Sequence, residues 1–382
     1  MKLVYVAYSA LDLQSANSLQ TFNTLRELSK RLGERLQIIV PRFGAEAPPP
    51  FPATRLARIP VNKLSRIRPN AWYSYIERSL YARRAIAKIR AGAAALIYTR
   101  DSVCAYRFIQ AGLPVLYEVH DLESRHPGQT KSARLQAWVR RADETILRGA
   151  RGIVSLTETF RQEIIANDWQ PAERVFVIPD AYDDAVYFPR DQILTRRALH
   201  LQVDAPLVAY AGLTFKYRGL DVLLRAFQAW NETRAQLLLI GGRAFEIQEL
   251  QTLARALELG DRVQLIGRQA PAVIAAYLAA ADALVIPDTV TDATASPLKM
   301  FEYMAMRRPI VCVDRAALRE ILDDAALYFP RGNVADLAAQ LARAIQPAAQ
   351  TLGVRARERV QEFTYAKRAE KIARAAESVL NA

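Results

Sequence analysis

The chain has 382 residues, 51% of them hydrophobic, and carries a formal net charge of +13. This length predicts two domains of about 150 to 200 residues, because one hydrophobic core rarely organises so long a chain. No apolar run approaches the ~20 residues that span a bilayer, so an integral membrane protein is not expected. The two cysteines, Cys104 and Cys312, are expected to be reduced core thiols of a cytoplasmic protein, and no metal site is expected.

In the first half, short apolar runs alternate with amphipathic stretches, a pattern typical of a parallel sheet covered by helices. The opening run, residues 2–8, is too short and too rich in Val and Tyr for a signal peptide, and is predicted to be a buried strand. Further strands are predicted at 36–40, 95–99, 114–120 and 152–157, with helices at 18–32 and 76–91.

The positive charge is concentrated in the first half. Residues 1–190 carry 28 basic and 18 acidic residues (+10), whereas 191–382 carry 24 and 21 (+3). Residues 55–90 combine ten basic residues and several aromatic ones with one acid, Glu77. This composition predicts peripheral contact with an anionic membrane, at the inner face of the cell membrane. A solvated helix face is the alternative, and nucleic acid is not expected because no recognised motif accompanies the charge.

The second half restarts the same rhythm after residues 177–192, which are rich in Pro, Asp and aromatic residues and are predicted to be a linker. The fold class is therefore predicted as α/β, with two facing, doubly wound parallel sheets. The first domain is predicted over 1–185, the second over 186–365, and a C-terminal helix that packs back on the first over 366–382. Strands of the second half are predicted at 207–212, 236–242, 262–267, 283–287, 309–313 and 326–329, and helices at 220–231, 245–258, 271–280, 298–306 and 315–322.

Ligands of open α/β sheets bind beyond the carboxyl ends of the strands, which is where the candidate residues lie. One predicted strand ends at Gly212, and the loop that follows carries Lys216 and Arg218 ahead of a helix. Free N–H groups at a helix start together with a guanidinium suit a diphosphate, although such basic turns also occur without a ligand. After the next strand, Gly241 and Gly242 would permit close approach of a ligand, without the full dinucleotide fingerprint.

A third candidate lies in residues 295–311, where Glu302 stands inside an apolar, helix-like run. Its carboxylate could accept hydrogen bonds from the two hydroxyls of a ribose. The alternative is an ordinary surface ion pair with Lys299, but the apolar neighbours favour a largely buried helix. Ser296 is expected to be the N-cap with proline next, so that the first N–H groups form an anion cradle. The cradle residues are Ser296, Pro297, Leu298 and Lys299.

At these residues the chain resembles the retaining glycosyltransferases of family 4, which have two facing Rossmann-like domains in the arrangement called GT-B. The resemblance covers nearly the whole chain, and its most specific part is "SPLKMFEYMAMRRPIV", residues 296–311. Three other segments follow the family's motifs in the expected order: "YEVHDLES" (117–124), "YAGLTFKYRG" (210–219) and "VQLIGRQAPAVIAAYLAAADALVIP" (263–287).

The resemblance implies roles for single residues. Glu302 matches the glutamate that holds the ribose, Arg218 matches the basic residue on the diphosphate, and His120 matches the first-domain histidine near the transferred sugar. Arg268 lies in the segment that matches the family's nucleotide loop. The predicted catalytic residues are His120, Arg218, Lys299 and Glu302.

Three features depart from the family pattern. Leu213 replaces an arginine that commonly follows the strand glycine, so that either Lys216 compensates or the phosphate pair is reduced to one basic residue. Thr294 replaces a second glutamate that usually contacts the donor sugar, and either Thr294 itself or Asp292 would substitute. The first loop lacks its usual glycines, so polar side chains of this loop are expected to meet the acceptor. These are Ser15, Asn17 and Gln20.

The sequence thus predicts a retaining, metal-independent hexosyltransferase that moves a sugar from a nucleotide-sugar donor to a hydroxyl acceptor. The expected context is polysaccharide or glycolipid synthesis, with an acceptor that can be lipid-linked and without a further cofactor. No pair of carboxylates suited to a glycosidase stands out. Two alternatives remain open, namely a sugar-nucleotide epimerase or hydrolase of the same fold and a non-catalytic partner subunit that binds nucleotide-sugar.

Overall fold

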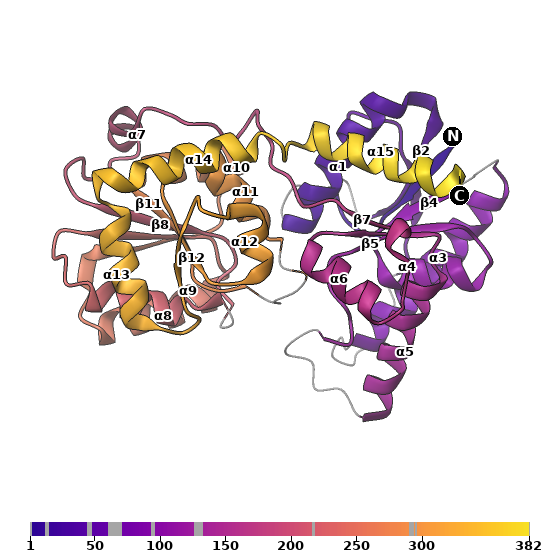
Figure 1. The fold of residues 1–382 in the computed structure, drawn as a ribbon, viewed down its shortest axis with the longest axis horizontal. Coiled ribbons are helices and arrows are strands. Elements are labelled where there is room, and N and C mark those ends of the chain that lie inside the picture. The colour runs from indigo at the N-terminus through magenta and orange to yellow at the C-terminus, as the bar shows by residue number, and fades with distance from the viewer. Residues whose placement is uncertain are drawn as a thin grey trace. The chain divides into compact units, whose positions relative to one another are not determined.

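The computed structural model divides the chain into two compact units, each built on one parallel sheet (Figure 1). The first unit comprises residues 1–179 and 365–382, and the second comprises 180–364. The structure describes residues 2–11, 15–43, 48–59, 71–92, 96–125, 133–215, 218–289, 294 and 296–381.

Within the described residues, the first unit has a seven-stranded sheet in the order β3-β2-β1-β4-β5-β6-β7. The order reverses between β1 and β4, and the carboxyl ends of the strands beside such a reversal are where open α/β sheets hold ligands. The strands are β1 (Leu3–Val6), β2 (Leu36–Arg42), β3 (Thr54–Ala57), β4 (Leu96–Thr99), β5 (Val115–Val119), β6 (Gly152–Ser155) and β7 (Val175–Val177). The helices are α1 (Ala16–Leu32), α3 (Ala71–Arg90), α4 (Ser102–Gln110), α5 (Ala133–Gly149), α6 (Glu158–Ala166) and α15 (Tyr365–Asn381).

The described part of the second unit has a six-stranded sheet in the order β10-β9-β8-β11-β12-β13, which reverses between β8 and β11. The strands are β8 (Leu207–Ala211), β9 (Gln236–Ile240), β10 (Val263–Ile266), β11 (Ala283–Ile286), β12 (Ile310–Val313) and β13 (Leu327–Phe329). The helices are α7 (Gln192–Ala198), α8 (Leu220–Ala229), α9 (Ala244–Ala256), α10 (Pro271–Ala280), α11 (Leu298–Ala305), α12 (Ala316–Leu322), α13 (Val334–Ala344) and α14 (Gln350–Val360).

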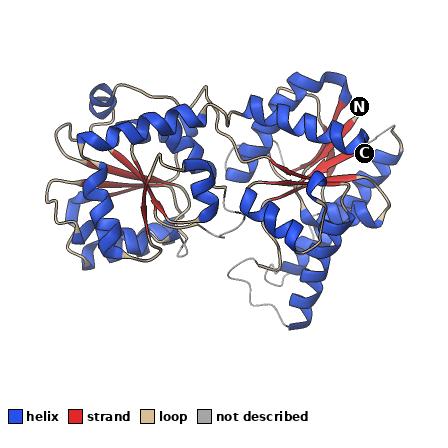
Figure 2. Ribbon diagram, viewed as in Figure 1, coloured by secondary structure: helices blue, strands red, loops and turns tan. Residues whose placement is uncertain are grey.

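Helices cover both faces of each sheet, which confirms the predicted doubly wound α/β class (Figure 2). The central strands read as continuous apolar runs because both of their faces are buried, as in β8, where all five residues are buried. No helix in the part of the chain that the structure describes is long and apolar enough to cross a membrane.

The C-terminal helix α15 belongs to the first unit, where it packs against α1 (Figure 1). Its apolar stripe, which includes Ile372, Ala376 and Val379, is buried in the core of that unit. Arg368 extends from the same helix, and its Nε donates to the Pro179 carbonyl at 3.1 Å. The last helix of the chain therefore completes the core of the domain that begins it.

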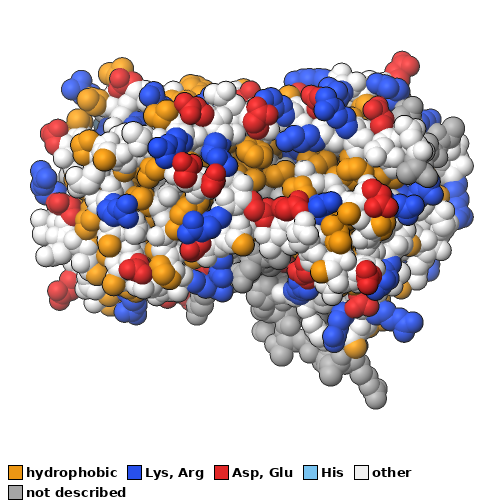
Figure 3. Space-filling view, in the orientation of Figure 1, with side chains coloured by type: hydrophobic (Ala, Val, Ile, Leu, Met, Phe, Trp, Pro, Cys, Tyr) orange, Lys and Arg blue, Asp and Glu red, His pale blue; other side chains and the backbone are white. Residues whose placement is uncertain are grey.

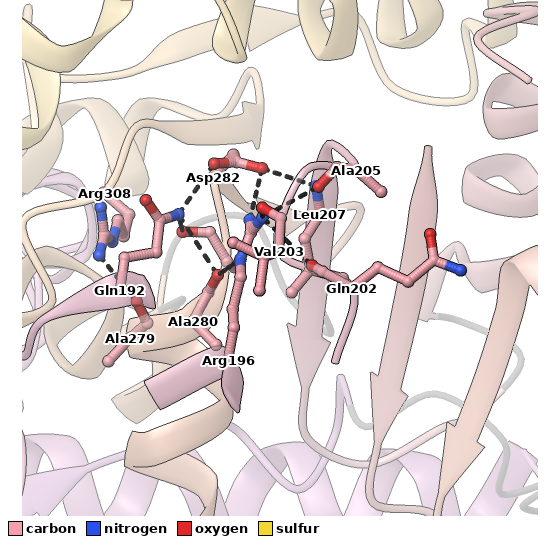
Figure 4. Close-up of polar contacts among 11 residues, drawn as sticks. Gln192, Arg196, Gln202, Val203, Ala205, Leu207, Ala279, Ala280, Asp282 and Arg308 are labelled. Atoms are coloured by element: carbon pink, nitrogen blue, oxygen red, sulfur yellow. Dashed lines mark hydrogen bonds and ion pairs between the residues drawn. The ribbon is translucent and has the colours of Figure 1, made fainter. Parts of the chain in front are cut away.

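A saturated polar network closes the amino end of the second sheet (Figure 4). Arg196 of α7 is 4% exposed and donates to four backbone carbonyls, those of Ala280 (2.8 Å), Val203 (2.7 Å), Ala205 (3.0 Å) and Gln202 (3.5 Å). Its remaining nitrogen pairs with Asp282 at 2.7 Å, just before β11. Asp282 also accepts from the Leu207 amide and from Gln192. This buried charge is paired and hydrogen-bonded, the condition under which such burial is tolerated.

Candidate active site

Two glycine turns bring the carboxyl ends of β8 and β9 into close contact. Gly241 has φ +115°, and a Cβ at this position would lie 2.2 Å from the Gly212 carbonyl oxygen. Gly242 has φ +87°, and a Cβ there would lie 2.4 Å from Oγ1 of Thr214. From the sequence, this glycine pair was predicted to permit the close approach of a ligand. The structure gives a reason within the chain, since only glycine fits against the neighbouring turn.

Lys299 lies on the first turn of α11 and reaches the end of β8. Its Nζ donates to the Tyr210 hydroxyl at 2.8 Å and lies 3.9 Å from the centroid of the same ring. A Cβ at Gly212 would lie 2.9 Å from this Nζ, so the glycine leaves room for the ammonium group. Lys299 is 9% exposed, which rules out the simple surface ion pair. Tyr210 was not singled out from the sequence, because a tyrosine in a buried strand is usually a core residue.

Arg218 adds a second positive charge close to Lys299. Burial lowers the pKa of Lys299 well below its usual range, and repulsion from Arg218 lowers it further, against the attraction of Glu302. Arg218 itself lies just before α8, and its amide donates to the Phe215 carbonyl at 2.8 Å. Leu213, which replaces the family's arginine, is 36% exposed. Lys216, the predicted compensating base, lies outside the described residues.

The start of α11 differs in one respect from the prediction. Ser296 is not the N-cap: Pro297 is, with φ −72° and ψ 129°, and the helix begins at Leu298. The Ser296 hydroxyl instead accepts the Asp180 amide at 3.2 Å, because the serine lies one residue too early to reach the first-turn amides. The N–H groups of Leu298 and Lys299 still occupy the first turn, where no intrahelical acceptor exists.

Glu302 lies one turn further along α11, between buried neighbours. Burial raises its pKa to about 7, although a hydrogen bond from Tyr187 and the charge of Lys299 act in the opposite direction. Tyr187 is 4% exposed and comes from residues 177–192, which the sequence assigned to a linker. That assignment concealed Tyr187 because the segment shows no period, and only the fold places its hydroxyl on the carboxylate.

Three further predicted positions of the second unit can be placed individually. Arg268 is exposed and follows the end of β10. Thr294, at the position of the family's second glutamate, is 6% exposed. Asp292, the other candidate substitute, lies outside the described residues. The residues that the structure brings together are therefore Lys299, Arg218 and Glu302, supported by Tyr210 and Tyr187.

In the first unit, His120 is the residue directly after β5, and its side chain lies within a buried polar network. Its Nε2 contacts the Glu118 carboxylate, and its Nδ1 lies 3.0 Å from a guanidinium nitrogen of Arg100. Since a guanidinium only donates, Nδ1 accepts and Nε2 carries the proton. Burial lowers the pKa of His120 to about 4, with Arg100 acting in the same direction against Glu118. The imidazole is thus neutral, with both ring nitrogens engaged.

Glu118 links this histidine to the C-terminal helix. Its second oxygen pairs with Arg368 of α15 at 2.8 Å and also accepts from the Tyr98 hydroxyl. Burial alone would raise the pKa of Glu118, but the charge of Arg368 and the hydrogen bond from His120 hold it well below its usual range. Arg368, 250 positions after Glu118 in the chain, therefore keeps this partner of His120 ionised, which no sequence motif indicates.

The three predicted acceptor residues lie at or near the start of α1. Ser15 caps this helix, with its hydroxyl accepting the Ser18 amide at 3.1 Å. Asn17 donates to the Ser9 hydroxyl at 3.1 Å. Gln20 is 2% exposed, and its Nε2 has no hydrogen-bond partner among the described residues. Of the three, only Gln20 retains an unused buried donor, whereas Ser15 has a structural role in the cap.

The basic segment, residues 55–90, divides into internal and exposed charges. Arg58 pairs with Glu77 and lies 4.1 Å from the centroid of the Phe43 ring. Arg78 lies 3.5 Å from Asp101. The remaining described bases of α3 are exposed: Arg83, Arg84, Lys88 and Arg90. Lys63, Arg66 and Arg68 lie outside the described residues.

The arrangement in the second unit can hold an anion. Two cations and the first turn of a helix lie together at the carboxyl end of a parallel sheet, where amide groups and the helix dipole both favour negative charge. A carboxylate one turn away is positioned to accept hydrogen bonds from hydroxyl groups of the same ligand.

Two family models match the chain and together cover most of it. The model described as "Glycosyltransferase Family 4" matches residues 20–186, and the model described as "Glycosyl transferases group 1" matches residues 205–347. The first falls mainly in the first unit and the second lies within the second unit.

Curated relatives match over part of their length. The D-inositol 3-phosphate glycosyltransferase of Kineococcus radiotolerans is 27% identical over 251 residues, which are 60% of this chain and 57% of that protein. The lipopolysaccharide 1,2-N-acetylglucosaminetransferase of Salmonella typhimurium is 25% identical over 162 residues, 40% of this chain and 42% of that protein. The chain thus spans about half the length of the curated relatives that it matches.

Solved structures share the fold along the whole chain. A sucrose-phosphate synthase from Thermosynechococcus elongatus superposes with a TM-score of 0.82 and 20% identity over 100% of both chains. HepE of Anabaena, solved in complex with UDP and glucose, superposes with a TM-score of 0.76 and 17% identity over 99% of both chains.

Proposed function

Because the chain belongs to the family 4 glycosyltransferases, we propose that it transfers a sugar from a nucleotide-sugar donor to a hydroxyl acceptor. The observation that carries the proposal is that two positive charges, those of Lys299 and Arg218, lie near each other beside the first turn of α11. Two like charges held close together in a poorly solvated place repel each other, and a diphosphate would relieve that repulsion. HepE, a structural neighbour, was solved with UDP, which makes a uridine donor the first to test.

In the proposed complex, Glu302 accepts hydrogen bonds from the ribose hydroxyls. Lys299, Arg218 and the amides of Leu298 and Lys299 stabilise the negative charge that develops on the departing diphosphate. Preorganised donors of this kind are commonly the largest single contribution to catalysis. Lys299 is poised for this role, because an approaching diphosphate would restore the pKa that burial and Arg218 have lowered.

We further propose that transfer retains the configuration at the anomeric carbon and needs no metal. A leaving phosphate oxygen would take the proton of the acceptor hydroxyl on the same face, so that no side chain has to act as base. This agrees with the state of His120, whose low pKa and engaged ring nitrogens do not suit proton transfer.

The test is sugar transfer measured with purified Glu302→Ala and Arg218→Ala variants. Each is expected to lower transfer by more than about tenfold, since each removes a charge-assisted contact to the donor. Exposed Glu249→Ala and Arg255→Ala on α9 serve as matched controls. Near-normal turnover in both site variants would refute the assignment.

The acceptor is proposed to be presented at an anionic membrane surface, in polysaccharide or glycolipid synthesis. The exposed bases of α3, Arg83, Arg84, Lys88 and Arg90, would each contribute about 1 kcal/mol near anionic headgroups. Figure 3 draws one face of the molecule, on which basic and acidic side chains are interspersed over both units. Flotation with vesicles should increase with anionic lipid and decrease when the four bases are changed to glutamine. Flotation that is independent of anionic lipid would count against membrane docking.

A non-catalytic nucleotide-sugar-binding subunit is the second candidate, favoured by exposed Leu213 at the position of the family's arginine. It would bind donor with the same dependence on Glu302 and Arg218 but would never turn over. An epimerase or hydrolase would instead release an epimer or free sugar without any acceptor. Product analysis of the same reactions separates these outcomes.

A further inference from the structure

A pocket that opens to solvent lies in the first unit, among α3, α4 and α5. Its walls include three aromatic side chains, Tyr75, Tyr106 and Trp138, and two acidic ones, Glu123 and Asp143. Four aliphatic side chains also line it, namely Val103, Val139, Ala142 and Ile146, together with Ser79, Ser102 and Arg107. The proposed donor site uses none of these residues, so the cavity needs an explanation of its own.

The aromatic rings stand at steep angles to one another. The Trp138 ring is 6.3 Å from Tyr75 at 89° between the planes, and 6.5 Å from Tyr106 at 67°. Rings inclined in this way do not stack on one another, and all three line the cavity. The electron-rich faces of aromatic rings attract cations. Trp138 is 45% exposed, which makes it the ring that a ligand from solvent meets first.

The acidic side chains differ in how far they are compensated. Glu123 accepts from the Tyr75 and Ser102 hydroxyls, both at 3.2 Å, and lies 3.8 Å from Arg78. Asp143 is 6% exposed and accepts the Ser124 amide at 2.9 Å, with further hydrogen bonds from the Ser124 hydroxyl and the Glu123 amide but no cation beside it among these contacts. Burial raises the pKa of Asp143 to about 6, so this carboxyl is still ionised at neutral pH in a place that disfavours its charge. A cation in the cavity would stabilise it.

The third lining charge, Arg107, is held by other groups. Its guanidinium donates to the Ser79 hydroxyl at 3.3 Å and to the Gln110 side chain at 3.2 Å, and lies 6.0 Å from the Tyr106 centroid. A phosphate-bearing ligand would be repelled by two carboxylates. A purely apolar chain would cover Asp143 without supplying a counter-charge. The remaining ligand that satisfies both the rings and the carboxylate is an organic cation.

We propose that this cavity binds a small quaternary ammonium compound, with the cationic group against Tyr75, Tyr106 and Trp138 and with Asp143 as its counter-ion. None of the residues proposed to hold the donor lines this cavity. The cavity would let the protein recognise a positively charged headgroup or metabolite through shape and charge together.

The experiment is calorimetric titration of the full chain with choline, compared with 3,3-dimethyl-1-butanol, the neutral carbon isostere of choline. Choline is expected to bind at least about tenfold more tightly than the isostere, because only choline gains from the ring faces and the carboxylate. Methyl α-glucoside is titrated in parallel, since aromatic rings with carboxylates also bind sugars.

Two variants and one control assign the site. Asp143→Asn and Trp138→Ala should each weaken choline binding by about tenfold or more, whereas Glu144→Gln, the same change at the next residue of α5, should leave it unchanged. Unchanged melting temperature of Asp143→Asn shows that the chain is folded. Equal affinity for the neutral isostere, preference for the glucoside, or no choline binding at about 10 mM would each overturn the proposal.

Discussion

The two ends of the sheet in the second unit both contain buried charge, but they treat it in opposite ways. At the amino end, Arg196 and Asp282 are bonded to each other and to surrounding backbone groups. At the carboxyl end, Lys299 and Glu302 have pKa values shifted towards their neutral forms. A charge that is fully hydrogen-bonded by its own chain holds the fold together, whereas a charge left short of partners is available to a ligand.

The largest effect is expected at the saturated end. Arg196→Met should lower the free energy of unfolding by about 3 to 5 kcal/mol, because Asp282 and several carbonyls lose their buried partner. Urea denaturation measures this loss, with exposed Arg197→Met on the same helix as the control. A loss below about 1 kcal/mol would mean that the network is not needed for stability.

The opposite pattern is expected for Lys299→Met. Transfer should fall by about 10²- to 10³-fold, which is about 2.7 to 4 kcal/mol in the barrier, because the departing diphosphate loses one fixed donor. The free energy of unfolding should stay the same or rise, since a buried and poorly solvated amine is replaced by an apolar side chain. Exposed Lys30→Met is the control. A large loss of stability with normal turnover of the folded protein would mean that Lys299 is a structural residue and not a functional one.

Glu302→Gln should remove a pH dependence of stability. The pKa of Glu302 is raised in the folded chain to about 7, so its contribution is fully present below the unfolded value near 4.5 and is lost as pH rises through 7. Relative to wild type, the glutamine variant should therefore gain about 1 to 3 kcal/mol between pH 4.5 and 7.5. If wild type and variant gave parallel curves of unfolding free energy against pH, the pKa of Glu302 would not be raised in the folded chain.

The smallest effect concerns His120, which should not titrate near neutral pH. Because the pKa of His120 is lowered to about 4, its ring signals in NMR should stay constant between pH 6 and 8. Assignment rests on the signals lost in His120→Gln. A midpoint inside that range would show that the network with Glu118 and Arg100 does not hold the ring neutral.

The strand pattern and most helices could be predicted because buried parallel strands leave continuous apolar runs, as in β8 and β11. The linker prediction hid Tyr187, whose segment shows no period but folds onto Glu302. Likewise, the Ser296 cap was wrong by one residue, since a sequence signal for a helix start is rarely more accurate than that.

Contacts across long separations were beyond prediction. Arg368 meets Glu118 only because α15 returns to the first unit, and nothing local to either residue indicates the pairing. The same holds for the aromatic cavity, whose Tyr75, Tyr106 and Trp138 come from three different helices. Single residues of the proposed donor site were easier to predict from the sequence, because strand ends and helix starts can be located from the local pattern.

The most direct measurement is a crystal structure of the chain with a bound nucleotide-sugar, UDP-glucose first. The diphosphate should lie within about 3.5 Å of the Lys299 ammonium and Arg218 guanidinium, with the ribose hydroxyls on Glu302. A nucleotide whose phosphates lie away from the start of α11, with Lys299 still bonded to Tyr210 alone, would contradict the account.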